Sequence, residues 1–341
     1  MDTAKRIEMM ALLGQDVVVL AKDNNGKIWL LGKDEPAQVS EATANTGNVK
    51  SDANSYTVTL KEESKDLPFE VTTETLNDLL TDWATEYLTF EIMDDGTDIR
   101  FITVEDHMHP QIEISLAGTN EWHVMTAEDP SDDIGMAGTL NIGRPLRKGE
   151  KIYLRGISDP FSEGPFVEAC FCPEGPICVY GSLGSLVDKD DFREFAEGDY
   201  AMEVACLFTH MFDGTYLNDG ENFYSHPTKQ LVFPFVEVTT SAYYALYGMF
   251  YGCSNMVYAP RIDVTSWDVP ASDRFGFMFY GCSSLKYIHV DFPLKQGANV
   301  ITPDWVNGVA SNGIFGTSVQ SNFSVPRGVN AVPANWKMVK I

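Results

Sequence analysis

Short apolar runs separated by turn-forming residues dominate the first part of the chain. Apolar side chains recur at helical spacing over residues 3–13, and this spacing predicts a short helix. Two apolar runs, residues 17–21 and 28–32, then flank a polar segment that contains Asn25 and Gly26. Because an Asn-Gly pair tolerates positive φ angles and forms tight turns, the two runs predict a β-hairpin.

The same alternation of apolar and polar positions continues through the middle of the chain. Residues 56–60 predict a strand that follows a turn near residues 46–48, and residues 73–83 predict a short helix. Further strands are predicted at residues 88–92, 99–104, 111–116, 122–125, 140–142 and 149–156. The first two of these flank an acidic turn with a glycine and are interpreted as a hairpin. Together the strands predict a small β-sandwich over residues 86–158.

The C-terminal half contains an internal repeat. Segments rich in Met, Phe, Tyr and Gly recur at residues 207–215, 246–256 and 275–285, with a weaker fourth copy at residues 313–317. Extended segments follow three of the copies, at residues 257–259, 287–290 and 322–325. Repeats of ~20–50 residues indicate a chain that winds into stacked coils, in which each coil buries its apolar side against the next.

The repeat also predicts which side chains lie inside the stack. Met and Phe at each step, together with a small inward Cys, give the predicted repeat core as Met211, Phe212, Met249, Phe250, Cys253, Met278, Phe279, Cys282 and Leu285. The neighbouring tyrosines have two interpretations, because aromatic rings contact sugars but also fill the cores of such stacks. The candidate glycan contacts are Tyr243, Tyr244, Tyr247 and Tyr251.

Composition and charge limit the classes of function. The chain has 341 residues, of which 44% are hydrophobic and 21% are charged, as in folded globular proteins with more than one domain. Its 24 Lys and Arg against 49 Asp and Glu give a net charge of −25. Because gripping nucleic-acid phosphates or an anionic membrane requires a basic face, we expect neither partner. No apolar stretch approaches the ~18 residues of a membrane span, and residues 1–14 lack the pattern of a secretory signal.

The sequence offers little catalytic or metal-binding chemistry. The six cysteines are few for this length, and without a secretory signal we expect them to be reduced thiols. Three clusters have metal-binding residue types: His107 with His109, the acidic run at residues 128–133, and Cys170 with Cys172 and Cys178. None has a full ligand set at a usual spacing, so a solvated loop, an acidic turn and packed small residues are the favoured interpretations. Nucleophile-elbow, phosphate-loop and zinc-helix motifs are also absent from the sequence, which predicts a non-enzymatic protein without cofactors.

The N-terminal segment resembles a known family. Over about residues 1–80 it resembles the second half of major tail (tube) proteins of tailed phages, particularly those of gut Bacteroidales phages, through residues 4–6, 17–32, 46–47, 56–60 and 68–71. In that family a helix lies beside a β-sandwich, and several copies close into a ring. Those proteins carry further strands before the helix, whereas Met1 here begins at the helix. The resemblance therefore implies either a C-terminal fragment or a short relative whose sheet another subunit completes.

The repeats resemble a second family, the BspA-like leucine-rich repeats. Residues 278–285 match the repeat motif, residues 305–315 its final repeat and residues 332–337 its closing cap, within a resemblance that spans about residues 160–341. Proteins that join a β-sandwich to such repeats occur in Bacteroidetes and their phages. The resemblances thus imply a multidomain, mainly β protein. Its expected parts are a tail-tube-like assembly segment (1–85), a β-sandwich (86–158) and leucine-rich repeats with a C-terminal cap (159–341).

These resemblances imply a function, with one alternative. The first hypothesis is a structural protein of a phage virion, assembled in the host cytoplasm, whose β-sandwich and repeats face outward. Its expected partners are further copies of itself in a ring or tube, other virion proteins, and a glycan or protein of the host surface. The alternative is a surface adhesin or carbohydrate-binding protein of a Bacteroidetes bacterium. That alternative shares the displayed domains but places them on the cell surface, and therefore requires export.

Overall fold

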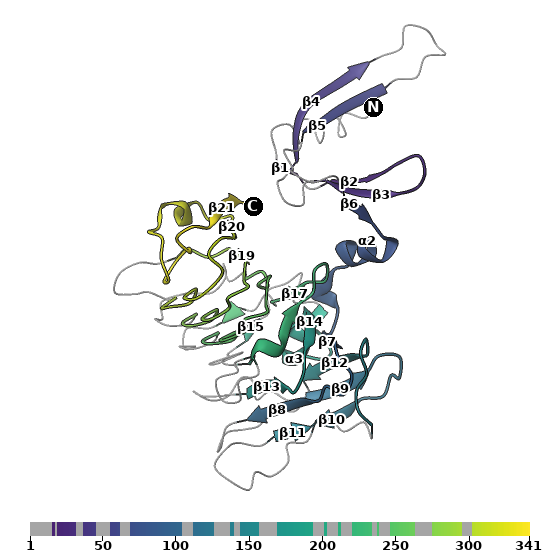
Figure 1. Cartoon of the computed structure of the whole chain (residues 1–341), viewed down its shortest axis with the longest axis vertical. Helices are drawn as coiled ribbons and strands as arrows, with labels where there is room; N and C mark the ends of the chain where they lie inside the picture. Colours follow the sequence, from purple (N-terminus) through teal and green to yellow (C-terminus); the bar gives the residue numbers. More distant parts are fainter. Residues whose placement is uncertain are drawn as a thin grey trace. The chain divides into compact units, whose positions relative to one another are not determined.

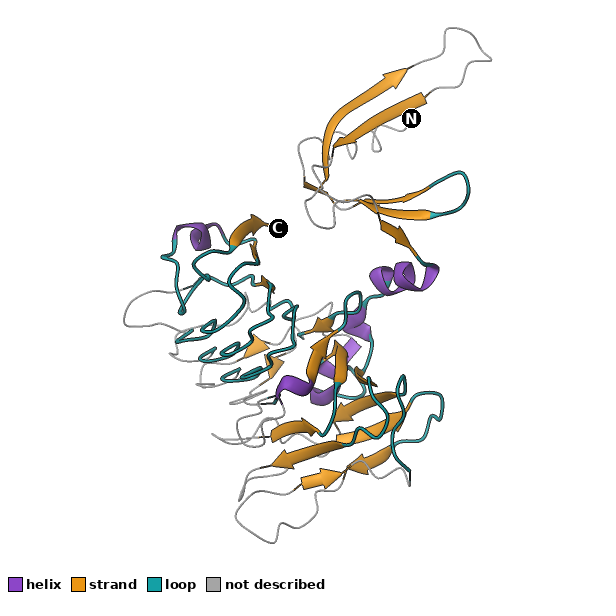
Figure 2. Cartoon of the chain, viewed as in Figure 1, coloured by secondary structure: helices purple, strands orange, loops and turns teal. Residues whose placement is uncertain are grey.

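The computed structural model shows a mainly β protein with several sheets, and its described residues include two short α-helices (Figures 1 and 2). It describes residues 16–17, 19–31, 37–45, 55–61, 69–103, 112–125, 137–139, 144–156, 169–193, 201–202, 211–212, 220–233, 237–238, 246–262, 275–294 and 302–341. The predicted helix at residues 3–13 lies outside these ranges. The chain divides into two compact units, Met1–Thr81 and Asp82–Ile341. Among the described residues, no helix has the length and apolar character needed to cross a membrane.

The first unit contains two three-stranded antiparallel sheets. One sheet joins β2 (Val19–Lys22), β3 (Ile28–Leu31) and β6 (Phe69–Val71), and the other joins β1 (Asp16–Val17), β4 (Ala37–Asn45) and β5 (Ser55–Lys61). The predicted hairpin is confirmed, since Lys22 pairs with Ile28 across a turn in which Gly26 has φ of +84°. The Asp23 carboxylate holds this turn by accepting hydrogen bonds from the backbone N–H groups of Asn25 (2.8 Å) and Lys27 (2.9 Å).

A helix follows the sheets of the first unit. Helix α2 (Thr73–Leu80) begins after Thr72, whose hydroxyl accepts a hydrogen bond from the Thr75 backbone N–H (3.1 Å), as an N-cap residue does. The helix was predicted to reach residue 83 but ends at Leu80. The chain then enters a separate 3₁₀ turn, η1 (Trp83–Thr85), in which the Asp82 side chain caps the Ala84 N–H (3.1 Å). Because Asp82 is a good capping residue, it favours a new start over continuation of α2.

Two sheets form the first part of the second unit. The larger sheet has the strand order β10-β9-β12-β7-β14-β16, with β17 also paired to β14, and the smaller has the order β11-β8-β13. Their bounds are β7 (Leu88–Ile92), β8 (Ile99–Thr103), β9 (Ile112–Leu116), β10 (His123–Met125), β11 (Ala137–Thr139), β12 (Lys151–Gly156), β13 (Ala169–Pro173), β14 (Ile177–Ser182), β16 (Phe223–Ser225) and β17 (Leu231–Val232). The sheets contact each other through Phe90 and Phe171, whose rings meet edge to face at 5.0 Å. Both sheets include strands from beyond residue 158.

One predicted pairing in this region is wrong. Strands β7 and β8 exist, but they lie in different sheets instead of forming a hairpin. Strand β7 pairs with β12 and β14, while β8 pairs with β11 and β13. The physical reason is that Phe90 and Ile99 are both buried, and facing sheets cover such apolar faces on both strands. Alternation in the sequence shows that a strand exists but does not identify its partner.

Beyond β17 the chain winds into stacked coils (Figure 1). The backbone N–H groups of Gly248, Phe250 and Gly252 donate to carbonyl groups of the next coil, those of Gly276, Met278 and Tyr280 (2.8–2.9 Å). The N–H groups of Phe277, Phe279 and Gly281 donate in turn to Pro303, Trp305 and Asn307 (2.8–2.9 Å). On the adjacent side, β19 (Tyr287–His289), β20 (Ile314–Thr317) and β21 (Lys337–Lys340) form a parallel sheet. Each coil is therefore hydrogen-bonded to the next on two sides.

Two expectations about the last coils need correction. The sequence predicts a weaker fourth copy of the repeat at residues 313–317, but these residues contain β20, which pairs with β19. The structural equivalent is the turn ending at Gly308, because Asn307 accepts the hydrogen bond from Gly281. Residues 322–325, expected to be extended, lie mostly in the 3₁₀ helix η5 (Gln320–Ser324). Asn322 stabilises this helix from inside, with its amide nitrogen donating to the Phe292 carbonyl (2.9 Å) and its amide oxygen accepting from the Leu294 N–H (2.8 Å).

The sheets and the coils of the second unit share one hydrophobic core. Buried residues from Leu88 to Trp336 belong to a single cluster. A column of rings crosses from the sheets into the coils: Phe171 stacks on Phe212 (5.9 Å), Phe212 on Phe250 (5.3 Å) and Phe250 on Phe279 (5.7 Å). The remaining described elements of this unit are α3 (Gly184–Val187), η4 (Gly220–Asn222), β15 (Ala201–Met202) and β18 (Glu237–Val238). The sheets and the coils are therefore packed together as one unit.

Candidate interaction surface of the coil stack

The interior of the stack is built from the repeated motif. The structure places all nine residues of the predicted repeat core in the interior, each no more than 2% exposed. The two cysteines add polar links between coils, because the Cys253 thiol donates to the Phe212 carbonyl (3.3 Å) and the Cys282 thiol to the Phe250 carbonyl (3.0 Å). A small side chain with a weak donor fits this inward position, whereas a larger one would separate the coils.

A column of glycines sets the close spacing of the turns. Gly252, Gly281 and Gly308 have φ of +75°, +76° and +84°, a left-handed conformation that side chains disfavour. They also lie close together: a Cβ atom added at Gly308 would meet the Gly281 Cα at 3.3 Å, and one at Gly281 would meet the Gly252 Cα at 3.5 Å. Backbone geometry and coil spacing thus both favour glycine in this column.

Burial keeps two of the cysteine thiols protonated. Burial raises the pKa of Cys178 to about 12 and moves the pKa of Cys282 upward as well, so both thiols stay protonated at neutral pH. No group of three or more His, Cys, Asp or Glu side chains suited to a metal is found among the described residues. His107, His109 and the acidic run at residues 128–133 lie outside the described part of the chain.

The candidate glycan contacts have different surroundings. Tyr243 and Tyr244 lie outside the described residues. Tyr247 is half-buried, and its ring covers the backbone of Gly276, where an added Cβ atom would lie 2.9 Å from the ring. Tyr251 stacks on Tyr280 with ring centroids 4.9 Å apart and planes 8° apart. The Tyr280 ring therefore covers one face of the Tyr251 ring. This leaves less aromatic surface on these two tyrosines for stacking against a sugar ring.

A second tyrosine column lies on the side of the parallel strands, where the sequence indicated only extended segments. Tyr258 and Tyr287 are bridge partners, and their rings stack at 4.7 Å. The same register continues from Tyr287 to Ile314 of β20 and Lys337 of β21. Partners in adjacent parallel strands project from the same face of a sheet. The sequence contains a signal for this column, namely the position of each tyrosine two residues after the apolar residue that ends the repeated motif.

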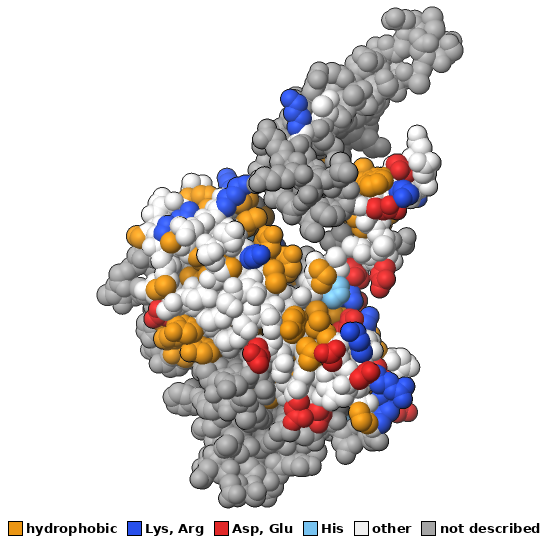
Figure 3. Space-filling model, in the orientation of Figure 1, with side chains coloured by type: hydrophobic (Ala, Val, Ile, Leu, Met, Phe, Trp, Pro, Cys, Tyr) orange, Lys and Arg blue, Asp and Glu red, His pale blue; other side chains and the backbone are white. Residues whose placement is uncertain are grey.

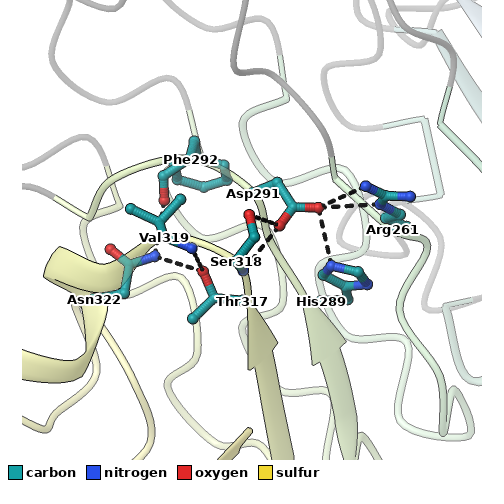
Figure 4. Close-up of polar contacts among 8 residues, drawn as sticks. All are labelled: Arg261, His289, Asp291, Phe292, Thr317, Ser318, Val319 and Asn322. Atoms are coloured by element: carbon teal, nitrogen blue, oxygen red, sulfur yellow. Dashed lines mark hydrogen bonds and ion pairs between the residues drawn. The ribbon is translucent and has the colours of Figure 1, made fainter. Parts of the chain in front are cut away.

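A buried carboxylate organises the same side of the stack (Figure 4). Asp291 Oδ2 accepts hydrogen bonds from Arg261 Nε (3.1 Å) and Nη2 (2.9 Å) and pairs with His289 Nε2 (2.9 Å). Its Oδ1 accepts from the Ser318 hydroxyl (2.6 Å) and backbone N–H (3.1 Å). Because side chains alternate along a strand, Tyr287, His289 and Asp291 share one face. We call this surface the strand face, defined by Tyr258, Arg261, Tyr287, His289, Asp291 and Lys337.

The electrostatics of Asp291 favour its charged form. Burial by itself would raise the pKa of this carboxyl group, whose side chain is only 4% exposed. The hydrogen bonds from Ser318, the charge of His289 and the hydrogen bond from Arg261 outweigh burial, and the pKa lies below its usual value. Arg261 remains 60% exposed, so Asp291 fixes one side of the guanidinium while much of it faces solvent. The cluster ties three successive coils together and orients a cation at the surface.

The residue types in this cluster resemble those of a hydrolase, but their arrangement does not. In a catalytic triad the serine hydroxyl gives its proton to the histidine, which the aspartate orients from the other side. Here Ser318 donates directly to Asp291 Oδ1, and His289 contacts Oδ2 of the same carboxylate. The serine is therefore not activated by the histidine. This arrangement holds the coils together and does not prepare a nucleophile.

A second polar cluster lies on the larger sheet. The Tyr180 hydroxyl donates to Glu91 Oε2 (2.8 Å), and Lys229 Nζ pairs with the same oxygen (3.3 Å) while lying over the Tyr180 ring. Burial, followed by the hydrogen bond to Glu91, raises the pKa of Tyr180, so the hydroxyl remains protonated and cannot act as a base. The cluster joins β7 and β14 to the segment before β17 and is structural.

Comparison with known proteins finds no relative of this chain. No protein-family model matches this chain, and neither the curated proteins nor the solved structures show a significant similarity to it.

Proposed function

We propose that the chain is a non-enzymatic structural protein of a phage virion, of the tail-tube type. In this proposal residues 1–85 assemble copies of the chain into a ring or tube, and the second unit is displayed outward with its strand face available to a host surface. Neither role requires a cofactor.

The observation that carries the assembly role is the incomplete β4–β5 sheet. Strands β4 and β5 have nine and seven residues and pair along their length, but β1 has only two residues and pairs with Ala37 and Gln38 alone. Within the described residues, most of β4–β5 is thus a two-stranded ribbon. Such a ribbon is marginally stable by itself in water, and an open strand edge is a template for another chain. A strand from a neighbouring copy would complete the sheet, as expected for a subunit of a ring.

The second unit has the complementary properties of a display module. It has its own continuous core, and its last strand ends the parallel sheet with Lys337 and Lys340, the charged residues that discourage pairing at an edge. The last coils are closed by two tryptophans, since Trp336 Nε1 donates to the Ala310 carbonyl (2.8 Å) and Trp305 Nε1 to the Ala331 carbonyl (2.7 Å). These caps favour a stack that ends and does not polymerise through its last coil.

Negative-stain electron microscopy of the purified full-length protein tests the assembly role. We expect regular rings or tubes for the wild type and single subunits for Thr57→Pro or Thr57→Lys in β5, because proline and charge both block pairing at an edge. Val124→Pro is the matched control, since β10 is an edge strand of the second unit and Val124 is 45% exposed. Unchanged thermal unfolding of the second unit would show that the Thr57 variants leave that unit intact, and an unchanged far-UV circular dichroism spectrum of the full-length chain would show that the sheets of the first unit are kept. Wild-type protein that remains monomeric at high concentration would refute the tube assignment.

The second candidate is an adhesin or carbohydrate-binding protein on a bacterial surface. The observation that favours it is the polar and aromatic strand face, which requires no ring to function. The two candidates separate in the same images, because the adhesin needs no regular assembly. An adhesin would also be found in the outer-surface fraction of its cell, whereas a tube protein would sediment with particles.

A further inference from the structure

The last coils are much less acidic than the chain as a whole. The chain has a net charge of −25. Residues 246–341 contain seven Lys and Arg against five Asp and no Glu. In the described parts of this segment (246–262, 275–294 and 302–341), the cations are Arg261, Lys286, Arg327, Lys337 and Lys340, and the acidic side chains are Asp291 and Asp304. Asp291 is buried under its partners. Blue and orange side chains accordingly lie together over the C-terminal part of the chain in Figure 3. The cations that this surface presents point to an anionic ligand.

The strand face arranges its groups at fixed positions. Tyr258 and Tyr287 stack at 4.7 Å, and Lys337 lies on the second strand beyond Tyr287 in the same register, roughly 10 Å away for strands ~4.8 Å apart. Arg261 is held by Asp291 with much of its guanidinium in solvent. Because the arginine is already oriented, binding an anion there would cost little side-chain entropy.

We infer that the strand face binds an anionic polysaccharide whose sugars carry carboxylate groups. Arg261 and Lys337 would pair with carboxylates, while the hydroxyl groups of Tyr258 and Tyr287 would exchange hydrogen bonds with sugar hydroxyls. The inference deepens the proposed display role, because it names the class of ligand that the displayed unit meets.

Other anionic polymers fit this surface less well. Single-stranded nucleic acid stacks its bases on free aromatic faces, whereas Tyr258 and Tyr287 stack on each other. An extended acidic peptide would add to the outer edge of β21, where Lys337 and Lys340 discourage strand pairing. Tyrosines beside separated cations on the strand face favour a sugar polymer.

Isothermal titration of the intact chain with three polymers tests the inference. Polygalacturonate supplies sugar and carboxylate, its highly methyl-esterified form keeps the sugar without most of the charge, and polyglutamate keeps the charge without the sugar. We expect binding to polygalacturonate, binding at least tenfold weaker to the esterified polymer, and none to polyglutamate. No binding to polygalacturonate, or equal binding to polyglutamate, would overturn the inference.

Three variants localise the site. Lys337→Gln should weaken polygalacturonate binding about fivefold, in line with the loss of one exposed ion pair, and Tyr287→Phe should weaken it without changing the net charge. Lys148→Gln is the control, because Lys148 is an exposed cation of the same unit in the turn before β12. Equal effects of Lys337→Gln and Lys148→Gln would place binding elsewhere. A failure to bind polygalacturonate would refute the ligand but not the proposed ring assembly. Wild-type protein that stays monomeric and still binds polygalacturonate would refute the tube assignment but not the ligand.

Discussion

The glycine column allows a graded test of how tightly the coils are stacked. Gly252, Gly281 and Gly308 have nearly the same left-handed conformation but different space around a new Cβ atom. At Gly252 nothing lies within 4 Å, at Gly281 the nearest atom is 3.5 Å away, and at Gly308 the Cα and N atoms of Gly281 are both 3.3 Å away. Alanine substitutions at the three sites therefore share one backbone cost and differ in crowding.

The expected magnitudes follow from these two contributions. A left-handed alanine costs ~1–2 kcal/mol, and the lower entropy of the unfolded chain offsets ~0.4–1 kcal/mol of that cost. Gly252→Ala and Gly281→Ala should each lower the free energy of unfolding by about 1 kcal/mol. Gly308→Ala must also push backbone against backbone, and overpacking of this kind typically costs ~1–3 kcal/mol. Its total loss should reach ~2–4 kcal/mol.

Urea unfolding of the full-length chain measures this order. Trp305 and Trp336 lie in the last coils and are buried, so their fluorescence reports the unfolding of the stack. All three variants should keep the wild-type m-value, because the surface exposed on unfolding is unchanged. A loss for Gly308→Ala no larger than that for Gly252→Ala would refute close backbone stacking. Stabilisation by Gly252→Ala would refute the left-handed turn itself.

Three further predictions concern the core and its polar links. Phe250→Ala should lower the free energy of unfolding by ~3–5 kcal/mol in the same urea titration. Phe250→Leu should lower it by less, because leucine keeps much of the volume and loses only the stacking on two neighbouring rings. The control is Phe323→Ala, at a site 38% exposed, which should change the free energy of unfolding by under ~0.5 kcal/mol. Asp291→Asn should cost ~1–3 kcal/mol at pH 7. Because the folded pKa of Asp291 is lowered, its stabilisation is present above the unfolded pKa of roughly 3.9 and is lost as pH falls through the folded pKa, so the two proteins should converge in acid. Cys178 and Cys282 should resist iodoacetamide at pH 8 in the folded protein and react after unfolding, as followed by mass spectrometry; rapid native labelling would contradict their raised pKa.

Local signals predicted local structure well. The Asn25-Gly26 turn and its flanking apolar runs predicted the β2–β3 hairpin because a tight turn of this kind depends only on residues close in sequence. Strands β5, β7 and β12 were likewise visible as alternating segments. Nothing local identified β4, whose small and polar residues have little strand preference and which is held by its pairing with β5.

The strand face shows where prediction from sequence stops. Arg261, His289, Asp291 and Ser318 come from three successive coils and are brought together by the register of the parallel strands. No spacing in the sequence relates Arg261 to Ser318. The repeated Met-Phe-Tyr-Gly-Cys motif predicted which side chains are alike from coil to coil but not which outward groups become neighbours.

The sequence by itself determined a mainly β chain, its internal repeat, the hairpin turn and the character of the interior, because periodicity, glycine and apolar side chains act over a few residues. Tertiary structure decided that β7 and β8 belong to different sheets and that the fourth turn ends at Gly308. It also decided that Asp291 is buried between coils with its charge held by three partners. These features depend on which segments pair across long stretches of chain, and that choice is made by burial of the whole core rather than by any one segment.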